Sequence, residues 1–189
     1  MQQIQLELEG GGTLTVCLRA SLDAMPTVKQ RPLVLVVPGG GYSHVSPREG
    51  DPVALQFAAA GYHTAVLTYS VGEEARDYRP LRQLSEALGL LRQHAEEWHI
   101  LPDKIAVCGF SAGGHLALSG AVLDIPGEMA QQRPDAVILG YPVITAGEYA
   151  HRGSFVQLAG SEDAADRHRA HWVTLCLEWL GRTFGFDLR

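Results

Sequence analysis

Four short apolar runs, separated by segments with helical signals, constrain the fold of this chain more than any other feature. The runs are "RPLVLVV" (31–37), "HTAVLTYSV" (63–71), "DKIAVCGF" (103–110) and "DAVILGYP" (135–142). A strand that is apolar along its whole length is typical of the centre of a parallel sheet, where both faces are buried. Strands that alternate with helices favour such a sheet. The sequence therefore predicts an α/β fold with a mostly parallel sheet and helices on both faces.

The intervening segments carry the helical signals. Asp51 followed by Pro52 predicts a helix that Asp51 caps, and Gly61 predicts its end. A helix over 80–98 is indicated by apolar residues at helical spacing, namely Leu84, Leu88, Leu91, Ala95 and Trp98. Another helix is expected over 111–122. At the start of the chain, residues 4–20 alternate in polarity around three glycines, which predicts a hairpin.

Length and composition indicate one globular domain over residues 1–189. The chain is 46% hydrophobic and 19% charged, which is ordinary for a protein with a substantial core. Residues 1–142 form the expected core by motif. Residues 143–171 are polar and are expected to be irregular or to form short helices. Residues 172–185 predict a terminal amphipathic helix.

Charge and cysteine content exclude several classes of function. The net charge is −6 with no run of Lys or Arg, so we expect no nucleic-acid partner and no membrane partner. The N-terminus lacks the basic and apolar regions of a signal peptide, and Cys17, Cys108 and Cys176 are widely spaced and odd in number. Reduced thiols and a cytoplasmic location are therefore expected. No histidine or cysteine pair has metal-ligand spacing, so we expect neither metal nor cofactor.

One short motif indicates chemistry. Gly109-Phe110-Ser111-Ala112-Gly113 follows a predicted strand and precedes a predicted helix. This is the context of a nucleophile elbow, in which the serine sits on a sharp turn between small residues. The Ala112 amide at the helix start would face developing negative charge on a reacting carbonyl. The alternative is a plain turn with no function.

A glycine loop follows the first apolar run. In "PGGGY" (38–42) the glycine amides could complete an oxyanion hole, because the strand before it is expected beside the strand that carries Ser111. A dinucleotide-binding loop is the alternative. It would need a further glycine and a helix opening directly from the loop, and the predicted helix is delayed until residue 52. A turn without function is the other reading.

With both glycine motifs in this order, the chain resembles the α/β-hydrolase superfamily. It is most similar to small bacterial esterases and lipases of the acetyl-esterase type, related to the hormone-sensitive-lipase group. The resemblance covers residues 1 to about 160 and is carried by "VVPGGGY" (36–42), 49–71, "PDKIAVCGFSAGGHLA" (102–117) and "GYPVI" (140–144). It implies hydrolysis of carboxylic esters, with acetyl groups on carbohydrate as one substrate class. It also implies Ser111 as nucleophile and the amides of Gly40, Gly41 and Ala112 as oxyanion donors.

The resemblance also implies an acid and a histidine after Ser111, and here the chain departs from the family. Only 48 residues follow Tyr141, and about 15–19 of them belong to the expected terminal helix. A strand with its helix takes about 30 residues, so two further strands and two catalytic loops do not fit. We therefore expect a sheet shortened by two strands, without the usual acid and histidine loops.

Substitutes for these two residues lie in the polar stretch. One arrangement pairs Ser111 with His168 as base and Asp163 as acid, while His151 and His171 are further histidines of the same region. His115, four residues after Ser111, is expected to pack or hydrogen-bond beneath the loop rather than act as the base.

Two functions remain open. The first is a serine hydrolase acting on small-molecule carboxylic esters, with a peptidase or thioesterase on the same fold as its variant. The second is a catalytically impaired hydrolase-like domain that binds a ligand or a partner, or a truncated gene product. Without further strands, residues 135–141 would form an apolar sheet edge, which invites pairing with a second copy of the chain.

Overall fold

A computed structural model describes residues 1–20, 29–125, 127–144 and 151–161 of the chain. Its elements in order are β1 (Gln2–Glu7), β2 (Thr13–Leu18), β3 (Arg31–Val37), the 3-10 turn η1 (Pro47–Glu49), α1 (Asp51–Ala59), β4 (His63–Thr68), the 3-10 turn η2 (Gly72–Ala75), α2 (Arg79–Gln93), β5 (Ile100–Phe110), α3 (Ala112–Val122), β6 (Ala136–Gly140) and α4 (Arg152–Ala159).

The described strands form one sheet in the order β1-β2-β4-β3-β5-β6. β4, β3, β5 and β6 run parallel to one another, and the β1–β2 hairpin joins them antiparallel through β2. The predicted α/β fold with its mostly parallel sheet and its N-terminal hairpin is therefore confirmed. β3 and β5 are parallel neighbours, so their carboxyl ends lie side by side. The glycine loop, which follows β3, and Ser111, which follows β5, therefore lie at the same end of the sheet.

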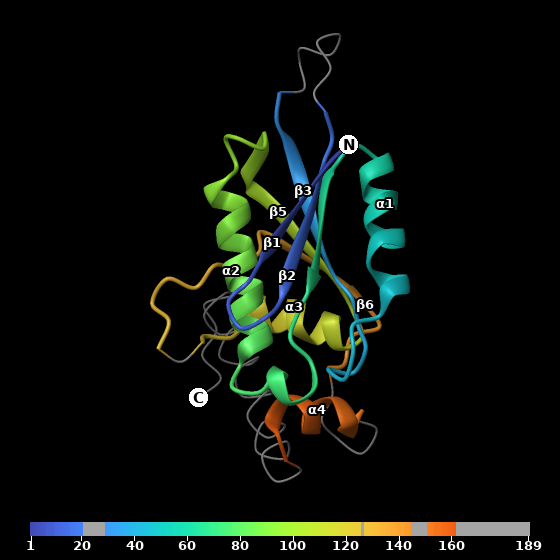
Figure 1. The fold of residues 1–189 in the computed structure, drawn as a ribbon, viewed down its shortest axis with the longest axis vertical. Coiled ribbons are helices and arrows are strands. Elements are labelled where there is room, and N and C mark those ends of the chain that lie inside the picture. The colour runs from blue at the N-terminus through green and yellow to red at the C-terminus, as the bar shows by residue number, and fades with distance from the viewer. Residues whose placement is uncertain (21–28, 126, 145–150, 162–189) are drawn as a thin grey trace, which may run out of the picture.

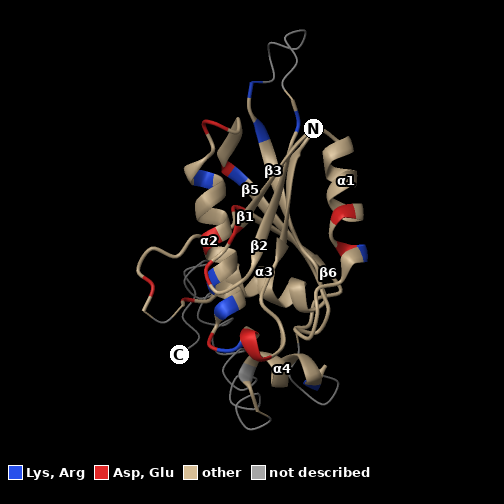
Figure 2. Cartoon of the chain, viewed as in Figure 1, with Lys and Arg blue, Asp and Glu red and all other residues tan. Residues whose placement is uncertain are grey.

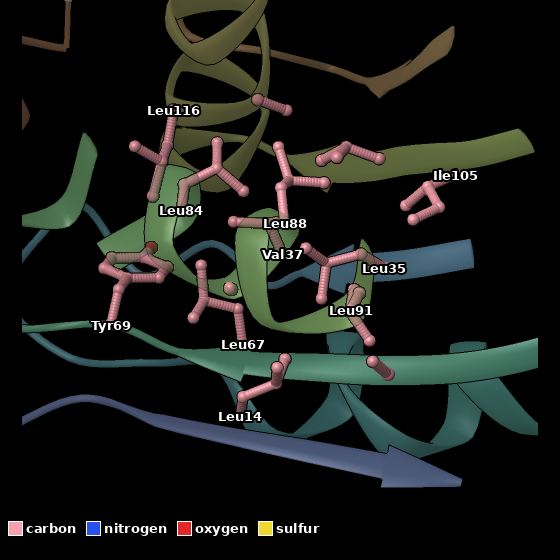
Figure 3. Packing of buried hydrophobic residues seen from close by; sticks show 14 of the residues in the cluster. Leu14, Leu35, Val37, Leu67, Tyr69, Leu84, Leu88, Leu91, Ile105 and Leu116 are labelled. Carbon is pink, nitrogen blue, oxygen red and sulfur yellow. The ribbon is translucent and has the colours of Figure 1, made fainter. Parts of the chain in front are cut away.

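The two faces of the sheet are covered by different helices, as Figure 1 shows. Val34 and Val36 of β3 pack in a small cluster with Ala54 of α1. Leu35 and the other alternate residues of β3 pack in a larger cluster with α2 and α3, part of which is drawn in Figure 3. The Val and Leu run of β3 is apolar on both sides because each side meets a helical layer.

α2 carries the expected apolar stripe, but it is shorter than the sequence indicated. Its last helical residue is Gln93, and the chain continues to Trp98 as turns. Ala95 and Trp98 are nevertheless buried, as their spacing predicted. The helix ends early because the chain must reverse into β5, which it does through His99 at a φ of 55°.

α1 begins where predicted, although Asp51 is not its cap. Gly50 holds the capping position and Asp51 is the first helical residue, with no side-chain capping bond. Gly50 has φ −93° and ψ −105°, which turns the chain sharply out of η1. At the other end, Gly61 has a φ of 107° and terminates the helix as expected.

α3 packs closely against the sheet because its first turn is built from small residues. A Cβ on Gly113 would come within 2.1 Å of the Val37 carbonyl oxygen and 2.3 Å of the Pro38 carbonyl oxygen. Only glycine allows the helix to lie against the end of β3 in this way. The start of α3 is thereby fixed beside the glycine loop that follows β3.

Charged residues are scattered along the described ribbon, with Lys and Arg positions interspersed among Asp and Glu positions (Figure 2).

α4 lies at the end of the molecule where the parallel strands finish (Figure 1). It is formed by the apolar cluster of the otherwise polar stretch 143–171. Among all the residues that the structure describes, no helix is both long and apolar enough to span a membrane.

Candidate active site

Ser111 lies on the sharp turn between β5 and α3. Its backbone has φ 50° and ψ −118°, a conformation that residues other than glycine rarely adopt. The turn is tight enough that a Cβ on Gly109 would come within 2.3 Å of the Gly113 carbonyl oxygen. Gly109 is therefore required by the geometry of the turn, and Gly113 by its close approach to the carbonyls of Val37 and Pro38.

The glycine loop lies directly against Ser111. A Cβ on Gly39 would be 3.0 Å from the Ser111 Cβ and 2.8 Å from the Phe110 carbonyl oxygen. This closeness follows from the parallel pairing of β3 with β5, in which Val37 is opposite Gly109. The structure thus brings the two glycine motifs of the sequence together at one place.

Hydrogen bonds fix the peptide planes of the glycine loop. The Gly39 carbonyl accepts from the Ser46 N–H at 2.9 Å, and the Gly40 carbonyl accepts from the N–H groups of Ser43 and His44 at 3.1 and 3.3 Å. In a trans peptide the N–H points opposite to the carbonyl. The N–H groups of Gly40 and Gly41 therefore point away from the turn that holds these carbonyls.

Gly40 and Gly41 also owe their conformations to the lack of a side chain. Gly40 has a φ of 130°, and a Cβ there would come within 2.0 Å of the His44 carbonyl oxygen. Gly41 has a φ of 65°. Ala112, the third predicted oxyanion residue, is buried and is the first residue of α3. The N–H groups of a first helical turn have no helical carbonyl to donate to.

Glu49 is a buried residue of this region that sequence reasoning missed. Its Oε2 accepts from the Gly39 N–H at 2.7 Å, and its Oε1 accepts from the Tyr141 hydroxyl at 2.6 Å. That hydrogen bond raises the pKa of Tyr141, because it stabilises the protonated hydroxyl beside a carboxylate. The one sequence signal was an acid between Pro47 and Gly50 in a segment without helical or strand periodicity.

Two buried tyrosines form hydrogen bonds at the glycine loop. The Tyr69 hydroxyl donates to the Pro38 carbonyl at 2.8 Å, and the Tyr42 hydroxyl lies 2.9 Å from Nδ1 of His115. Burial raises the pKa of both tyrosines. His115 is buried and packs edge-on against Phe155 of α4 at a ring distance of 5.7 Å. The prediction that His115 bonds beneath the loop is therefore confirmed.

One histidine of the polar stretch reaches the glycine loop. The Cε1 of His151 is 3.6 Å from the place a Cβ on Gly41 would occupy, and its Nδ1 is 2.8 Å from the Ser154 hydroxyl. His168 and Asp163 lie outside the described residues. Between the residues that the structure does describe, no hydrogen bond joins a histidine ring to the Ser111 hydroxyl.

A metal centre has no counterpart in the described ranges. They contain no group of three or more His, Cys, Asp or Glu side chains placed to hold an ion. The described site offers a serine hydroxyl, backbone amides, a helix N-terminus, and the side chains of Glu49 and His151.

Comparison with known proteins identifies a family. The BD-FAE family model matches residues 23–137. The endo-1,4-β-xylanase B of Butyrivibrio fibrisolvens is 36% identical over 147 residues, which are 70% of this chain and 22% of that protein. The acetylxylan esterase of Xylanibacter ruminicola is 33% identical over 135 residues, 70% of this chain and 27% of that protein. The chain therefore spans about a quarter of the length of these two relatives.

The solved structures agree with the fold described above. An α/β hydrolase from a Medee basin deep-sea metagenome library is 41% identical, with a TM-score of 0.69. The match covers 78% of this chain and 60% of that one. Since the family model covers more than half of the sequence, and the sheet and its helices match a solved α/β hydrolase, this chain belongs to the BD-FAE family and has an α/β-hydrolase fold.

Proposed function

We propose that this chain hydrolyses carboxylic esters with Ser111 as the nucleophile. The observation that carries the proposal is the backbone of Ser111, held at φ 50° and ψ −118° between β5 and α3. Strained residues of this kind persist only where the surrounding structure enforces them, and they cluster at functional sites. A serine on a strand-to-helix turn of this fold is exposed for attack on a carbonyl carbon.

The amides of Gly40, Gly41 and Ala112 are the proposed oxyanion hole. When the Ser111 oxygen bonds to the ester carbon, the carbonyl oxygen gains negative charge. N–H groups that are already directed stabilise that charge without having to reorganise. The N-terminus of α3 adds the positive end of its dipole. The loop hydrogen bonds described above support this assignment, because they direct the two glycine amides away from the turn.

A base must take the proton from the serine hydroxyl as the bond forms. We propose His168 with Asp163 for this role, and His151 as the alternative, supported by its position beside Gly41. The protonated histidine then gives the proton to the departing alcohol, which leaves an acyl-serine. Water, deprotonated by the same histidine, attacks the acyl-serine and releases the carboxylic acid.

We propose a short acyl group, in particular acetyl on carbohydrate, as the substrate class. The support is that one relative, from Xylanibacter ruminicola, is named an acetylxylan esterase and another is named a xylanase.

We place the protein in the cytoplasm. The supporting observation is that Cys17 and Cys108, the two cysteines in the described residues, are free thiols.

The test combines a fluorophosphonate probe with p-nitrophenyl acetate turnover. Ser111→Ala should abolish both labelling and turnover. The matched control is Ser119→Ala, on the same helix, whose buried hydroxyl has no hydrogen-bond partner among the described residues. His168→Ala and His151→Ala identify the base, since loss of the base lowers turnover by orders of magnitude. A wild-type protein that the probe does not label would overturn the proposal.

A second function is favoured by one observation. β6 is the edge strand of the described sheet, and its Ile138 and Leu139 are 44% and 38% exposed. These neighbouring residues point to opposite faces, so the edge is apolar on both sides. We propose that a second copy of the chain pairs along 135–141, whether or not the protein is an active esterase.

A further inference from the structure

Glu49 places a carboxylate in the interior beside Ser111, and the chemistry proposed above gives it no role. The residue is 7% exposed. Its Oε2 and the Ser111 Cβ both lie within 3.0 Å of the place a Cβ on Gly39 would occupy. Among the residues that the structure describes, its cationic partner is the exposed Arg48, whose Nε is 3.8 Å from Oε1. Removing a charge from water is costly unless hydrogen bonds replace the lost hydration.

The first such bond fixes a peptide plane of the glycine loop. The Gly39 N–H donates to Oε2 of Glu49, and the carbonyl of the same peptide, that of Pro38, accepts from the Tyr69 hydroxyl at 2.8 Å. The next carbonyl, of Gly39 itself, accepts from Ser46. Gly39 is therefore held at both its N–H and its carbonyl, and the direction of the Gly40 N–H follows from this.

The second bond reaches the other side of Ser111. Tyr141, which donates to Oε1 of Glu49, directly follows β6 and has a positive φ of 37°. Its neighbour Gly140 accepts a hydrogen bond from the Ser111 N–H at 3.0 Å. One carboxylate thus joins the loop after β3 to the loop after β6, with the serine turn between them.

We propose that Glu49 is the positioning residue of the oxyanion loop. By holding the Gly39 N–H on one oxygen and the Tyr141 hydroxyl on the other, it sets the orientation of the Gly40 and Gly41 amides relative to Ser111. Glu49 does not touch the reacting atoms. The expected effect of Glu49 on the reaction rate rests on the proposed serine-hydrolase function. Its hydrogen bond to the Gly39 N–H does not depend on that function.

Activity variants separate geometry from charge. Glu49→Gln keeps an oxygen that can accept from Gly39 and an NH2 group that can donate to the Tyr141 oxygen, while Glu49→Asp keeps the charge but shortens the reach. The matched control is Glu86→Ala, because the Glu86 carboxylate also accepts a backbone N–H, that of Glu9 at 3.0 Å, away from Ser111.

We expect Glu49→Ala to lower kcat and the fluorophosphonate labelling rate by roughly 10- to 100-fold with KM nearly unchanged, since displaced oxyanion donors weaken only the transition state. Glu49→Gln should recover most of this loss, Glu49→Asp should recover less, and Glu86→Ala should match the wild type. Better recovery by Asp than by Gln would overturn the proposal. So would a folded Glu49→Ala protein that keeps the wild-type rate.

A measurement without catalysis tests the same contact. In 15N-labelled full-length protein, the Gly39 amide proton should resonate far downfield and exchange slowly, because it donates to a charged acceptor in the interior. Ser111→Ala should leave this signal in place, and Glu49→Gln should move it upfield. If the probe fails to label the wild type, the proposed function is wrong while this signal still decides the role of Glu49. An unchanged Gly39 signal in Glu49→Gln overturns that role.

Discussion

Ser111 is held in its unusual backbone conformation by bonds from several segments. Its N–H donates to the Gly140 carbonyl at 3.0 Å. Its carbonyl accepts from the His115 N–H at 3.0 Å and the Val143 N–H at 3.1 Å. A residue forced into such a region costs about 1–3 kcal/mol of stability. The position of this one side chain therefore lowers the free energy of unfolding.

This strain makes a prediction about stability. Ser111→Gly should unfold with a free energy about 1 kcal/mol higher than Ser111→Ala, because glycine adopts the conformation without strain and loses only about 0.5–1 kcal/mol in chain entropy. Urea denaturation of the two variants measures the difference. Neither variant should react with the probe. A Ser111→Gly variant that is about 0.5–1 kcal/mol less stable than Ser111→Ala would show that Ser111 is unstrained.

At the opposite end of the sheet, His63 is buried in its neutral form. Its Nδ1 accepts from the Arg19 N–H at 3.1 Å, and its Nε2 donates to the His99 carbonyl at 3.2 Å. Burial lowers the pKa of His63, and the nearby Arg31 and Arg19 lower it further, against the hydrogen bond to His99. A proton on Nδ1 would break the bond to Arg19.

This arrangement predicts acid sensitivity. Because the folded-state pKa lies below the unfolded value of about 6.5, the unfolded chain binds the proton more tightly. The contribution of His63 to stability is therefore present above about pH 6.5 and is lost as the pH falls through the lowered pKa. His63→Gln keeps an acceptor and a donor without titrating. Its free energy of unfolding should decline less between pH 7.5 and 5 than that of the wild type; a decline equal to the wild type's would exclude His63.

At the scale of elements, two helical glycines have different surroundings. Gly113 begins α3, where a Cβ would overlap the Val37 and Pro38 carbonyls. Gly89 lies in α2, where a Cβ would meet only the Gln132 Cγ at an ordinary 3.5 Å. Intrinsic helix propensity favours alanine at both positions. The sequence alone cannot separate these glycines, because the difference lies in what packs against each helix.

The two alanine variants should therefore change stability in opposite directions. Gly89→Ala should raise the free energy of unfolding by up to about 1 kcal/mol, through helix propensity. Gly113→Ala should lower it by about 1–3 kcal/mol, because the backbone of β3 has to move. Thermal and urea unfolding of the pair test this. A stabilised Gly113→Ala protein would mean that α3 is not held against β3 as described.

For the whole molecule, the pairing proposed at the β6 edge makes a prediction about the oligomeric state. Light scattering should give a mass of twice 20.5 kDa if a second copy pairs there. Leu139→Lys should shift the protein to monomer, because a charge on an edge strand opposes pairing. Met129→Lys, at a fully exposed loop residue, is the control and should not change the mass. A monomeric wild type at all concentrations would exclude this interface.

Much of this architecture could be predicted because it depends on local patterns. The apolar runs of β3 and β5, the Gly10 hairpin and the buried stripe of α2 are each readable along a few residues. The glycine motif around Ser111 was readable for the same reason, since the turn itself requires Gly109. The predicted nucleophile and oxyanion residues remain predictions about chemistry.

The amino-acid sequence by itself determined the class of fold, the family, and the two glycine motifs, because periodicity and turn chemistry act between near neighbours in the chain. Only the tertiary structure decided that Gly39 lies against Ser111 and that His151 reaches Gly41. It also decided that Glu49 joins Gly39 to Tyr141, which lies 92 residues after Glu49 in the chain. Such contacts arise when parallel strands end side by side at one edge of the sheet. No spacing in the sequence records that proximity.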